Sequence, residues 1–397
     1  MTLTLLVDLD DTLLVNDMDI FIPAYLKSLS GYMAAFHEPK GFVEKLLAAT
    51  DTMVRNNDPG CSLKETFDKA FYPALGLRQE AVAPALDTFY RQVFPSLAEN
   101  TQPVSGAANF INTAFQRGCQ VVIATNPLFP CSAIQERLKW AGVPVQQYPY
   151  AIVTAYENFH FAKPNPAYYA EILANLGWPD GPVVMLGNDP VADIQAAQLL
   201  GLATYRVDQA GLQAGRHGRG PLGCFFDWLD ETGENELLPI FDSRAASLAS
   251  LRATAAVLPG LLDDLDDKTW RKRPQENEWS LVEVLCHLRD VEAEVNLKRL
   301  NMLLHGDNPF MPAADPDPWA KERQYLRQDG MQACQEFCEN RKRLLDLVET
   351  LHEAGWQRSA RHAIFGPTTL QEIVSIMAGH DRLHVRQIFQ TLHNVAT

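Results

Sequence analysis

The sequence predicts an α/β domain with a parallel sheet covered by helices on both faces, followed by an all-α domain. In the first half, three apolar runs each precede a polar turn and a helical pattern; they are Leu3–Val7, Gln120–Ala124 and Val183–Leu186. Strands that alternate with helices in this way form parallel sheets. From about residue 244 onward the strand pattern vanishes and four amphipathic stretches follow. Four such helices favour a four-helix bundle.

The length of the chain, 397 residues, exceeds what one hydrophobic core usually serves, so more than one domain is expected. The segment Glu231–Ser243 carries Gly, Glu, Asn and Pro and has the composition of a linker. We therefore expect a first domain over 1–240 and a second over 241–397.

The net charge of −15 excludes a protein that binds the nucleic-acid backbone, because such proteins present basic faces. The sequence contains no run of the ~20 apolar residues needed to span a bilayer, and no basic segment precedes the short apolar run at the N-terminus. The seven cysteines are scattered without a CxxC pair, which indicates reduced thiols and a cytoplasmic location.

The first predicted strand is followed by helices only, over about residues 16–100. One of these helices begins with a capping box formed by Ser62 and Glu65. An insert at this point would lie over the carboxyl edge of the sheet as a cap, although an additional packed subdomain explains the pattern equally well. The alternation then resumes, with a last strand expected to end near Val207 and an exposed Gly/Arg-rich loop over 215–220.

In the second half, two of the four predicted helices begin with capping boxes, Ser280 with Glu283 and Thr369 with Glu372. The helices are predicted over residues 244–266, 280–305, 328–354 and 369–394. The long connection over 306–327 is rich in Pro, Asp and Trp, and long loops in compact domains often have a function.

Candidate catalytic residues follow the first strand, in Asp8-Leu9-Asp10-Asp11-Thr12. The strand would place Asp8 at its carboxyl end, and the turn would bring Asp10 back toward the same space. One carboxylate could then attack phosphorus while the other donates and accepts a proton. Two carboxylates this close repel each other, and a divalent cation would relieve the repulsion.

Three later segments supply the groups that such chemistry needs. Thr125 and Asn126 follow the second strand and could donate to a phosphoryl oxygen, and Lys163 offers a cation for the phosphoryl charge. Asp189 and Asp193 follow the third strand. Mg²⁺ prefers oxygen ligands and keeps several waters, so a few carboxylates and one backbone carbonyl would hold it.

Taken in order, these four segments resemble the motifs of the haloacid dehalogenase-like (HAD) hydrolases, over about residues 1–235. The resemblance implies a Rossmann-like sheet with a C1-type cap and an aspartyl-phosphate intermediate. It assigns the catalytic residues Asp8 and Asp10, the phosphate-binding residues Thr125, Asn126 and Lys163, and the Mg²⁺ ligands Asp8, Asp10 (through its carbonyl), Asp189 and Asp193.

The resemblance also favours a phosphatase over a dehalogenase, because dehalogenases of this family do not need the acid at position 10. In this family the cap determines the substrate, and the cap residues here form no recognisable motif. A small phosphorylated metabolite, such as a sugar phosphate, phosphoglycolate or a nucleotide, is the expected partner.

A second candidate site lies on the predicted bundle. His380 and His384 are four residues apart and so share one face of the last helix, and His287 lies on another helix. Three imidazoles from two helices would bind a metal and leave one coordination position open. His362 is expected to be solvent-exposed.

The segments around these histidines resemble the DinB-like (YfiT-type) bundles, over about residues 245–395. The resemblance implies that His287, His380 and His384 bind a divalent metal, and imidazole ligands do not choose among Zn²⁺, Ni²⁺, Fe²⁺ and Mn²⁺. It also implies a low-molecular-weight thiol as an alternative partner, since some members are thiol-dependent transferases. Two further alternatives for the bundle are dimerisation, as in a homodimer, and ligand sensing.

Overall fold

The computed structural model describes residues 2–396, and the chain divides into two compact units. The first unit ends at Ile240 and the second begins at Phe241, except that the short segments Asp58–Gly60 and Ala170–Trp178 are grouped with the second.

The first unit is built around a six-stranded sheet in which every neighbouring pair is parallel. In spatial order the strands are β5 (Ile152–Val153), β4 (Gln120–Ile123), β1 (Thr4–Val7), β6 (Val183–Gly187), β7 (Ala203–Val207) and β8 (His217–Gly220). The predicted parallel sheet is thus confirmed, with β1 at its centre.

The register of the central strands determines where the functional residues lie. Val7 at the end of β1 pairs with Ile123 on one side and Leu186 on the other. The segments that follow these three strands therefore leave the sheet at the same edge, where α/β folds bind their ligands.

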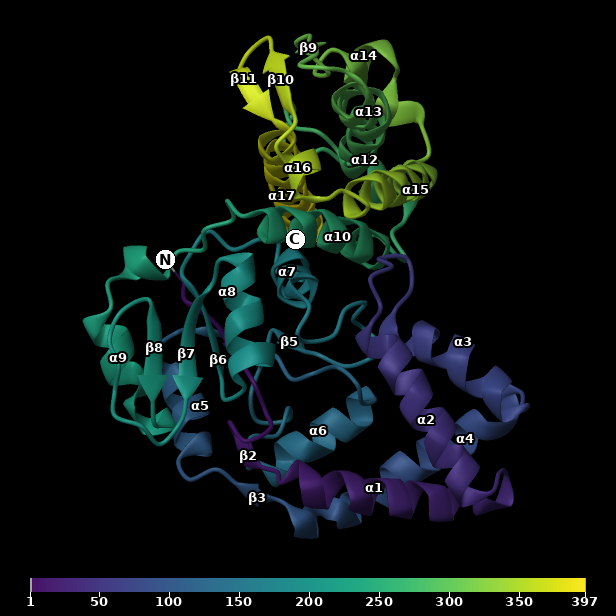
Figure 1. Ribbon diagram of the computed structural model, residues 1–397, viewed down its shortest axis with the longest axis vertical. Helices are drawn as coiled ribbons and strands as arrows, with labels where there is room; N and C mark the ends of the chain where they lie inside the picture. Colours follow the sequence, from purple (N-terminus) through teal and green to yellow (C-terminus); the bar gives the residue numbers. More distant parts are fainter. Residues whose placement is uncertain (1, 397) are drawn as a thin grey trace. The chain divides into compact units, whose positions relative to one another are not determined.

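Helices cover both faces of this sheet, as Figure 1 shows. They are α5 (Ala107–Gln116), α6 (Cys131–Trp140), α7 (Pro166–Asn175), α8 (Ala196–Leu200) and α9 (Phe225–Glu231). Fully buried side chains of β1, such as Leu5 and Val7, form one hydrophobic core with Phe110, Ile111 and Phe225. Burial on both faces explains why the central strands are continuous apolar runs in the sequence.

The helical insert contains α1 (Met18–Tyr32), α2 (Pro39–Val54), α3 (Leu63–Leu75) and α4 (Gln79–Gln92). The insert is flanked by a two-stranded antiparallel ribbon, in which β2 (Leu14–Val15) pairs with β3 (Gln102–Pro103). The capping box predicted from Ser62 and Glu65 is present at the start of α3.

The expectation of an exposed loop over 215–220 was wrong, because His217–Gly220 forms the edge strand β8. Gly218 allows Trp228 to pack directly on this strand, since a Cβ atom at position 218 would lie 2.3 Å from the indole Nε1. Glycine has low strand propensity, so this segment has no strand pattern that could be recognised from its residues.

The second unit contains the four long helical stretches that the sequence predicts. They are α10 (Arg244–Leu261), α12 (Leu281–Val291) continued through a π-helical turn (Glu292–Asn296) into α13 (Leu297–His305), α15 (Gly330–Glu349) and α17 (Leu370–Ala396). Both predicted capping boxes are present, at Ser280 with Glu283 and at Thr369 with Glu372. None of the helices within residues 2–396 is long and apolar enough to cross a membrane.

The expectation that the second half lacks strands was also wrong. A small sheet in the order β11-β10-β9 is formed by β9 (Phe310–Met311), β10 (Ser359–His362) and β11 (Gly366–Thr369). Strands of two to four residues are too short to show a periodic pattern. The remaining short helices of this unit are α11 (Asp267–Arg271), α14 (Trp319–Glu322) and α16 (Glu353–Trp356).

A buried ionic network joins the helices of the second unit. The guanidinium of Arg341 on α15 donates to Glu292 at 2.6 Å and to Asp381 on α17, and all three residues are at most 1% exposed. Burial alone would lower the pKa of Arg341, but the two carboxylates outweigh burial and raise it. The network therefore holds one cation against two carboxylates inside the bundle.

We expect Arg341→Met to destabilise the second unit by about 3–5 kcal/mol, because it leaves two buried carboxylates without a cation. Hydrogen–deuterium exchange of the full chain would show the loss as reduced protection of α12 and α17. Arg343→Met, on the exposed face of the same helix, is the matched control. Equal loss of protection in both variants would contradict this account.

Candidate functional sites

The first candidate site lies at the carboxyl edge of the sheet and is built around Asp8, the residue that follows β1. The Asp8 side chain is buried, and its backbone N–H donates to the carbonyl of Leu186 at 2.9 Å. One carboxylate oxygen accepts from the hydroxyl of Thr12 at 3.1 Å. The carboxylate is thereby held in one orientation at the end of the strand.

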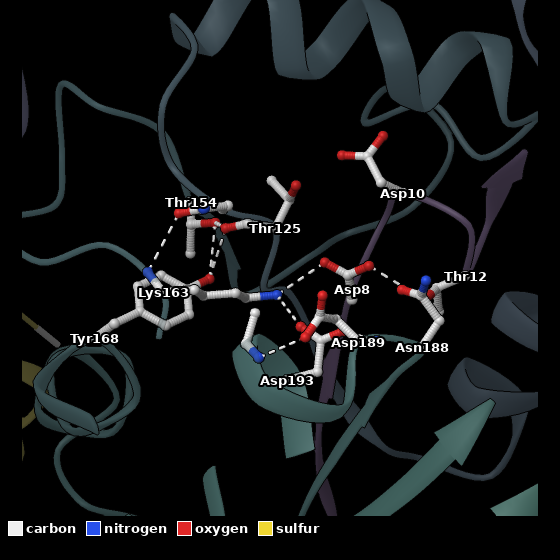
Figure 2. Close-up of polar contacts among 12 residues, drawn as sticks. Asp8, Asp10, Thr12, Thr125, Thr154, Lys163, Tyr168, Asn188, Asp189 and Asp193 are labelled. Carbon is white, nitrogen blue, oxygen red and sulfur yellow. Dashed lines mark hydrogen bonds and ion pairs between the residues drawn. The ribbon is translucent and has the colours of Figure 1, made fainter. Parts of the chain in front are cut away.

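Lys163 brings a buried cation to Asp8. Its ammonium donates to Oδ1 of Asp8 at 2.8 Å and to Oδ1 of Asp193 at 2.6 Å, and Figure 2 shows the three side chains converging. Burial alone would lower the pKa of Lys163, but Asp193 and Asp8 outweigh burial and raise it well above its usual value. The ammonium is therefore fully protonated at neutral pH.

Thr125 and Asn126 follow β4 at the same edge. The hydroxyl Oγ1 of Thr125 is buried and has no hydrogen-bond partner among residues 2–396. The backbone carbonyl of Thr125 accepts from Thr154 at 2.7 Å and from Tyr168 at 2.8 Å, which fixes this turn. Asn126 has a different contact, because its side-chain oxygen accepts from the backbone N–H of Lys163 at 3.2 Å. The structure thus leaves Thr125 ready to donate, while Asn126 supports the Lys163 loop.

The turn after β6 places Asp189 and Asp193 differently. Asp193 is buried, with one oxygen on Lys163 and the other accepting from the backbone N–H of Asp189 at 3.0 Å. Its close approach requires Gly187, since a Cβ atom there would lie 2.3 Å from Asp193 Oδ2. Asp189 is exposed, and its Oδ1 accepts from the N–H groups of Val191 and Ala192 at 2.7 Å.

The charges and donor atoms of this site suit a hard divalent cation. Asp8, Asp189 and Asp193 supply three carboxylates against one ammonium, so the site carries surplus negative charge. Burial raises the pKa of Asp193, and Asp8 adds to the effect while Lys163 opposes it. Oxygen donors in this excess are the ligands that Mg²⁺ prefers.

Asp10 does not lie where the sequence analysis placed it. Its side chain is turned away from Asp8 and Lys163, as Figure 2 shows. The carboxylate is ion-paired with the buried guanidinium of Arg137 on α6 and accepts from the side-chain amide of Asn16 at 2.8 Å. The expectation that the turn brings the Asp10 side chain back beside Asp8 was therefore wrong for this structure.

Sequence reasoning missed Arg137. It is 1% exposed and packs between the rings of Phe21 and Phe129, each 5.5 Å from its guanidinium carbon. Burial lowers the pKa of Arg137 to about 10, which Asp8 partly opposes, so the side chain remains a cation at neutral pH. A lone arginine within a helix has no motif spacing, and only the fold brings it to Asp10.

The second candidate site consists of three imidazoles in the second unit. The Nε2 atom of His380 lies 3.1 Å from Nε2 of His287 and 3.1 Å from Nε2 of His384. Three ligand atoms, one from each residue, lie within 4.8 Å of one another, so a single metal ion could contact all of them. The structure thus brings together all three histidines predicted as ligands.

The protonation state of these histidines suits a metal. Burial, together with His384 and His380, lowers the pKa of His287 to about 3. Burial is also the main cause that lowers the pKa values of His380 and His384 to about 4. All three rings are therefore neutral at pH 7, the form in which imidazole binds metals.

Neighbouring side chains orient the three rings. Trp279 packs against His287 at 4.8 Å and stacks on His384 at 6.3 Å between ring centroids. Nδ1 of His384 lies 2.9 Å from Oε1 of Gln387, a contact that leaves Nε2 free to bind a metal. The expectation that His362 is exposed was wrong: it is buried, and its Nδ1 accepts from the backbone N–H of Ile364 at 3.1 Å.

The first unit thus has a parallel sheet with a buried aspartate and a buried lysine at its carboxyl edge. The family model of the haloacid dehalogenase-like hydrolases matches residues 2–201, and the chain belongs to this family. The family model of the DinB superfamily matches residues 250–388, so the second unit is a DinB-like domain.

Individual relatives are distant. The uncharacterized protein YuaE of Bacillus subtilis (strain 168) is 25% identical over 138 residues, which cover 32% of this chain and 85% of YuaE. The four-helix bundle protein YfiT of B. subtilis is 18% identical and covers 37% of this chain and 85% of its own, with a TM-score of 0.35.

Solved structures similar to the first unit include enzymes of two activities. A HAD phosphatase from Thermococcus onnurineus is 15% identical, covering 58% of this chain and 98% of its own, with a TM-score of 0.37. A 2-haloacid dehalogenase from Pseudomonas syringae pv. Tomato DC3000 is 17% identical, and the match covers 58% of this chain and 99% of the dehalogenase, with a TM-score of 0.42. Membership of the haloacid dehalogenase-like family, shown by the family model, establishes a hydrolase.

We expect Arg137→Met to destabilise the first unit, because Asp10 loses its cation. In a chain that also carries Asp10→Asn, Arg137→Met should lower the free energy of unfolding by about 1–3 kcal/mol less than it does alone, because no carboxylate is then left unpaired. Hydrogen–deuterium exchange of β1 and α6 measures both costs. Lys139→Met, at an exposed position of the same helix, is the control. Additive costs in the double variant would show that Arg137 and Asp10 are not coupled.

Proposed function

We propose that the first unit is a Mg²⁺-dependent phosphatase that hydrolyses phosphate monoesters through an aspartyl-phosphate on Asp8. The observation that carries this proposal is the Lys163 ammonium, 2.8 Å from the Asp8 carboxylate in a buried site. A nucleophilic carboxylate and a dianionic phosphoryl group repel each other, and a buried cation lowers that repulsion.

In the first step an oxygen of Asp8 attacks phosphorus and the bond from phosphorus to the alcohol oxygen breaks. The Thr125 hydroxyl and the Lys163 ammonium hold the phosphoryl oxygens, and Asp10 donates a proton to the departing alcohol. Asp10 then accepts a proton from water, which attacks phosphorus and releases phosphate with Asp8 regenerated. Asp8, Asp189 and the Asp10 carbonyl would hold a Mg²⁺ ion, which would neutralise charge on the phosphoryl group.

Proton transfer by Asp10 requires its side chain to leave Arg137 and turn toward the departing oxygen. A carboxylate at position 10 supports the phosphatase over a dehalogenase, because attack on carbon with loss of halide needs no proton donor. Asp10 is thereby the residue on which the choice of reaction depends.

We expect Asp8→Asn to lower hydrolysis of p-nitrophenyl phosphate with Mg²⁺ by at least about a thousandfold, because the amide is a poor nucleophile. Asp19→Asn, an exposed position on α1, should leave the rate unchanged. Removal of Mg²⁺ with a chelator should stop turnover, and added Mg²⁺ should restore it. Undiminished turnover by Asp8→Asn, or chloride release from 2-chloropropionate without phosphatase activity, would overturn the proposal.

We further propose that the second unit binds one divalent transition metal through His287, His380 and His384, in support of a second, metal-dependent reaction. Convergence of three neutral imidazoles favours this function over a bundle that only dimerises or senses a ligand. The small-molecule thiol implied by the resemblance is the co-substrate to try first, in conjugation to an electrophile.

We expect elemental analysis of the purified full chain to find about one transition-metal ion per chain, because three imidazoles suffice for a catalytic site. His380→Ala combined with His384→Ala should lose this metal while keeping its helical circular dichroism. His393→Ala, an exposed position of the same helix, should keep it. A wild-type chain without transition metal after growth in metal-supplemented medium would refute the site.

A further inference from the structure

The first unit contains a cavity of about 410 Å³ whose walls come from all four cap helices and from the loops after β4 and β5. Small-molecule sites usually occupy about 300–1,000 Å³ and are lined mainly by apolar side chains. The cavity is separate from the charged groups around Asp8, none of which lines it. The cavity lining would therefore contact a part of the ligand other than its phosphoryl group.

The walls are largely aromatic and aliphatic. The Tyr25 ring lies 5.2 Å from that of Phe129, and Phe67 lies 6.5 Å from Tyr156. The hydroxyls of Tyr25 and Tyr90 are 2.7 Å apart and hydrogen bond to each other. Burial raises the pKa of Tyr25 to about 12, so this pair stays neutral.

The charged side chains on the lining are already paired. Lys64 binds Asp68 at 2.5 Å, and Arg91 binds Asp87 at 3.1 Å. Glu157, the remaining charged lining residue, accepts from the backbone N–H of Cys131 at 2.9 Å. The lining thus has two cations against three carboxylates, a surplus of negative charge.

The same two loops shape the cavity and the phosphoryl site. Phe129, on the cavity wall, lies four residues after Thr125 and also packs against Arg137, the partner of Asp10. The backbone N–H of Tyr156 donates to the carbonyl of Phe129 at 3.2 Å. Two residues before Tyr156, Thr154 holds the carbonyl of Thr125. A ligand whose phosphoryl group is at Asp8 would thus extend toward this wall.

We propose that the cavity receives the organic part of the phosphate monoester, and that this part is an uncharged aromatic or branched-alkyl alcohol. The inference rests on the phosphatase activity proposed above and adds the class of substrate. A second anionic group, as in phosphoglycolate or a nucleotide, would meet an excess of carboxylates. A sugar would bury its hydroxyls against walls that are mainly aromatic and aliphatic, at a desolvation cost.

The test compares benzyl phosphate with glycerol 3-phosphate and phosphoglycolate as substrates of the full chain with Mg²⁺. All three release a primary alcohol, so differences in leaving-group chemistry are small. We expect kcat/KM for benzyl phosphate to exceed the others by at least about tenfold, since even one methylene in an apolar pocket is worth about 10–200-fold.

A pair of matched variants on α4 locates the preference. Ala83 lines the cavity and Ala81 does not, although both lie on the same helix. Ala83→Phe should lower kcat/KM for benzyl phosphate by about tenfold and leave that for glycerol 3-phosphate unchanged. Ala81→Phe should leave kcat/KM for both substrates unchanged. A fall in kcat/KM for both substrates in Ala83→Phe would indicate misfolding.

Binding gives a readout that is independent of turnover. Calorimetry should show that benzylphosphonate binds at least about tenfold more tightly than methylphosphonate, and that Ala83→Phe removes the difference. Suppose that turnover depends on Asp8 but benzyl phosphate is not preferred over the other two substrates. The proposed substrate class would then be wrong, and the proposed phosphatase activity would stand. Preferential benzylphosphonate binding without turnover of any monoester would overturn the phosphatase and leave the cavity's preference standing.

Discussion

The Lys163 ammonium lies buried between the carboxylates of Asp8 and Asp193, and the geometry of the first site depends on this contact. Each partner comes from a different segment: Asp8 from the end of β1, Lys163 from the loop before α7, and Asp193 from the turn after β6. An uncompensated charge at this depth would cost several kcal/mol, so the three segments are held together electrostatically as well as by the sheet. Asp193 therefore positions the lysine, and Asp8 and Asp189 are left as the carboxylates best placed for a cation.

The two candidate sites differ in the charge of their buried groups. The first gathers carboxylates around one ammonium and leaves an excess of negative charge, which suits a hard cation and repels a second anion. The second keeps three imidazoles neutral and places the charged Arg341 network beside them, through Asp381 next to His380. Neutral nitrogen ligands suit a transition metal rather than Mg²⁺. The donor atoms of the two sites thus suit different classes of metal ion.

The sequence predicted those features that local spacing determines. Asp8 follows a hydrophobic strand, His380 and His384 share a helical face, and the capping boxes mark where helices begin; each signal lies within a few residues. The register of β1 against β4 and β6 could also be anticipated, because parallel strands end at a common edge.

Features that arise from tertiary packing left no such signal. The pairing of Asp10 with Arg137 spans 127 positions, and neither residue is marked by its neighbours. The strand β8 consists mostly of glycine and arginine, and its stability comes from Trp228 packing on Gly218. The cavity is formed by side chains from the four cap helices and from the loops after β4 and β5, so its apolar character appears only once they are assembled.

The ribbon of β2 and β3 has a consequence for how this protein can change over evolution. Because Leu14–Val15 pairs with Gln102–Pro103, the two ends of the cap insert lie about 4.8 Å apart, one strand spacing. An insert whose ends are adjacent can be lengthened, shortened or exchanged without altering the sheet that carries it. The residues of the insert can therefore diverge quickly, while the segments that carry Asp8, Lys163 and Asp193 stay in place at the carboxyl edge of the sheet.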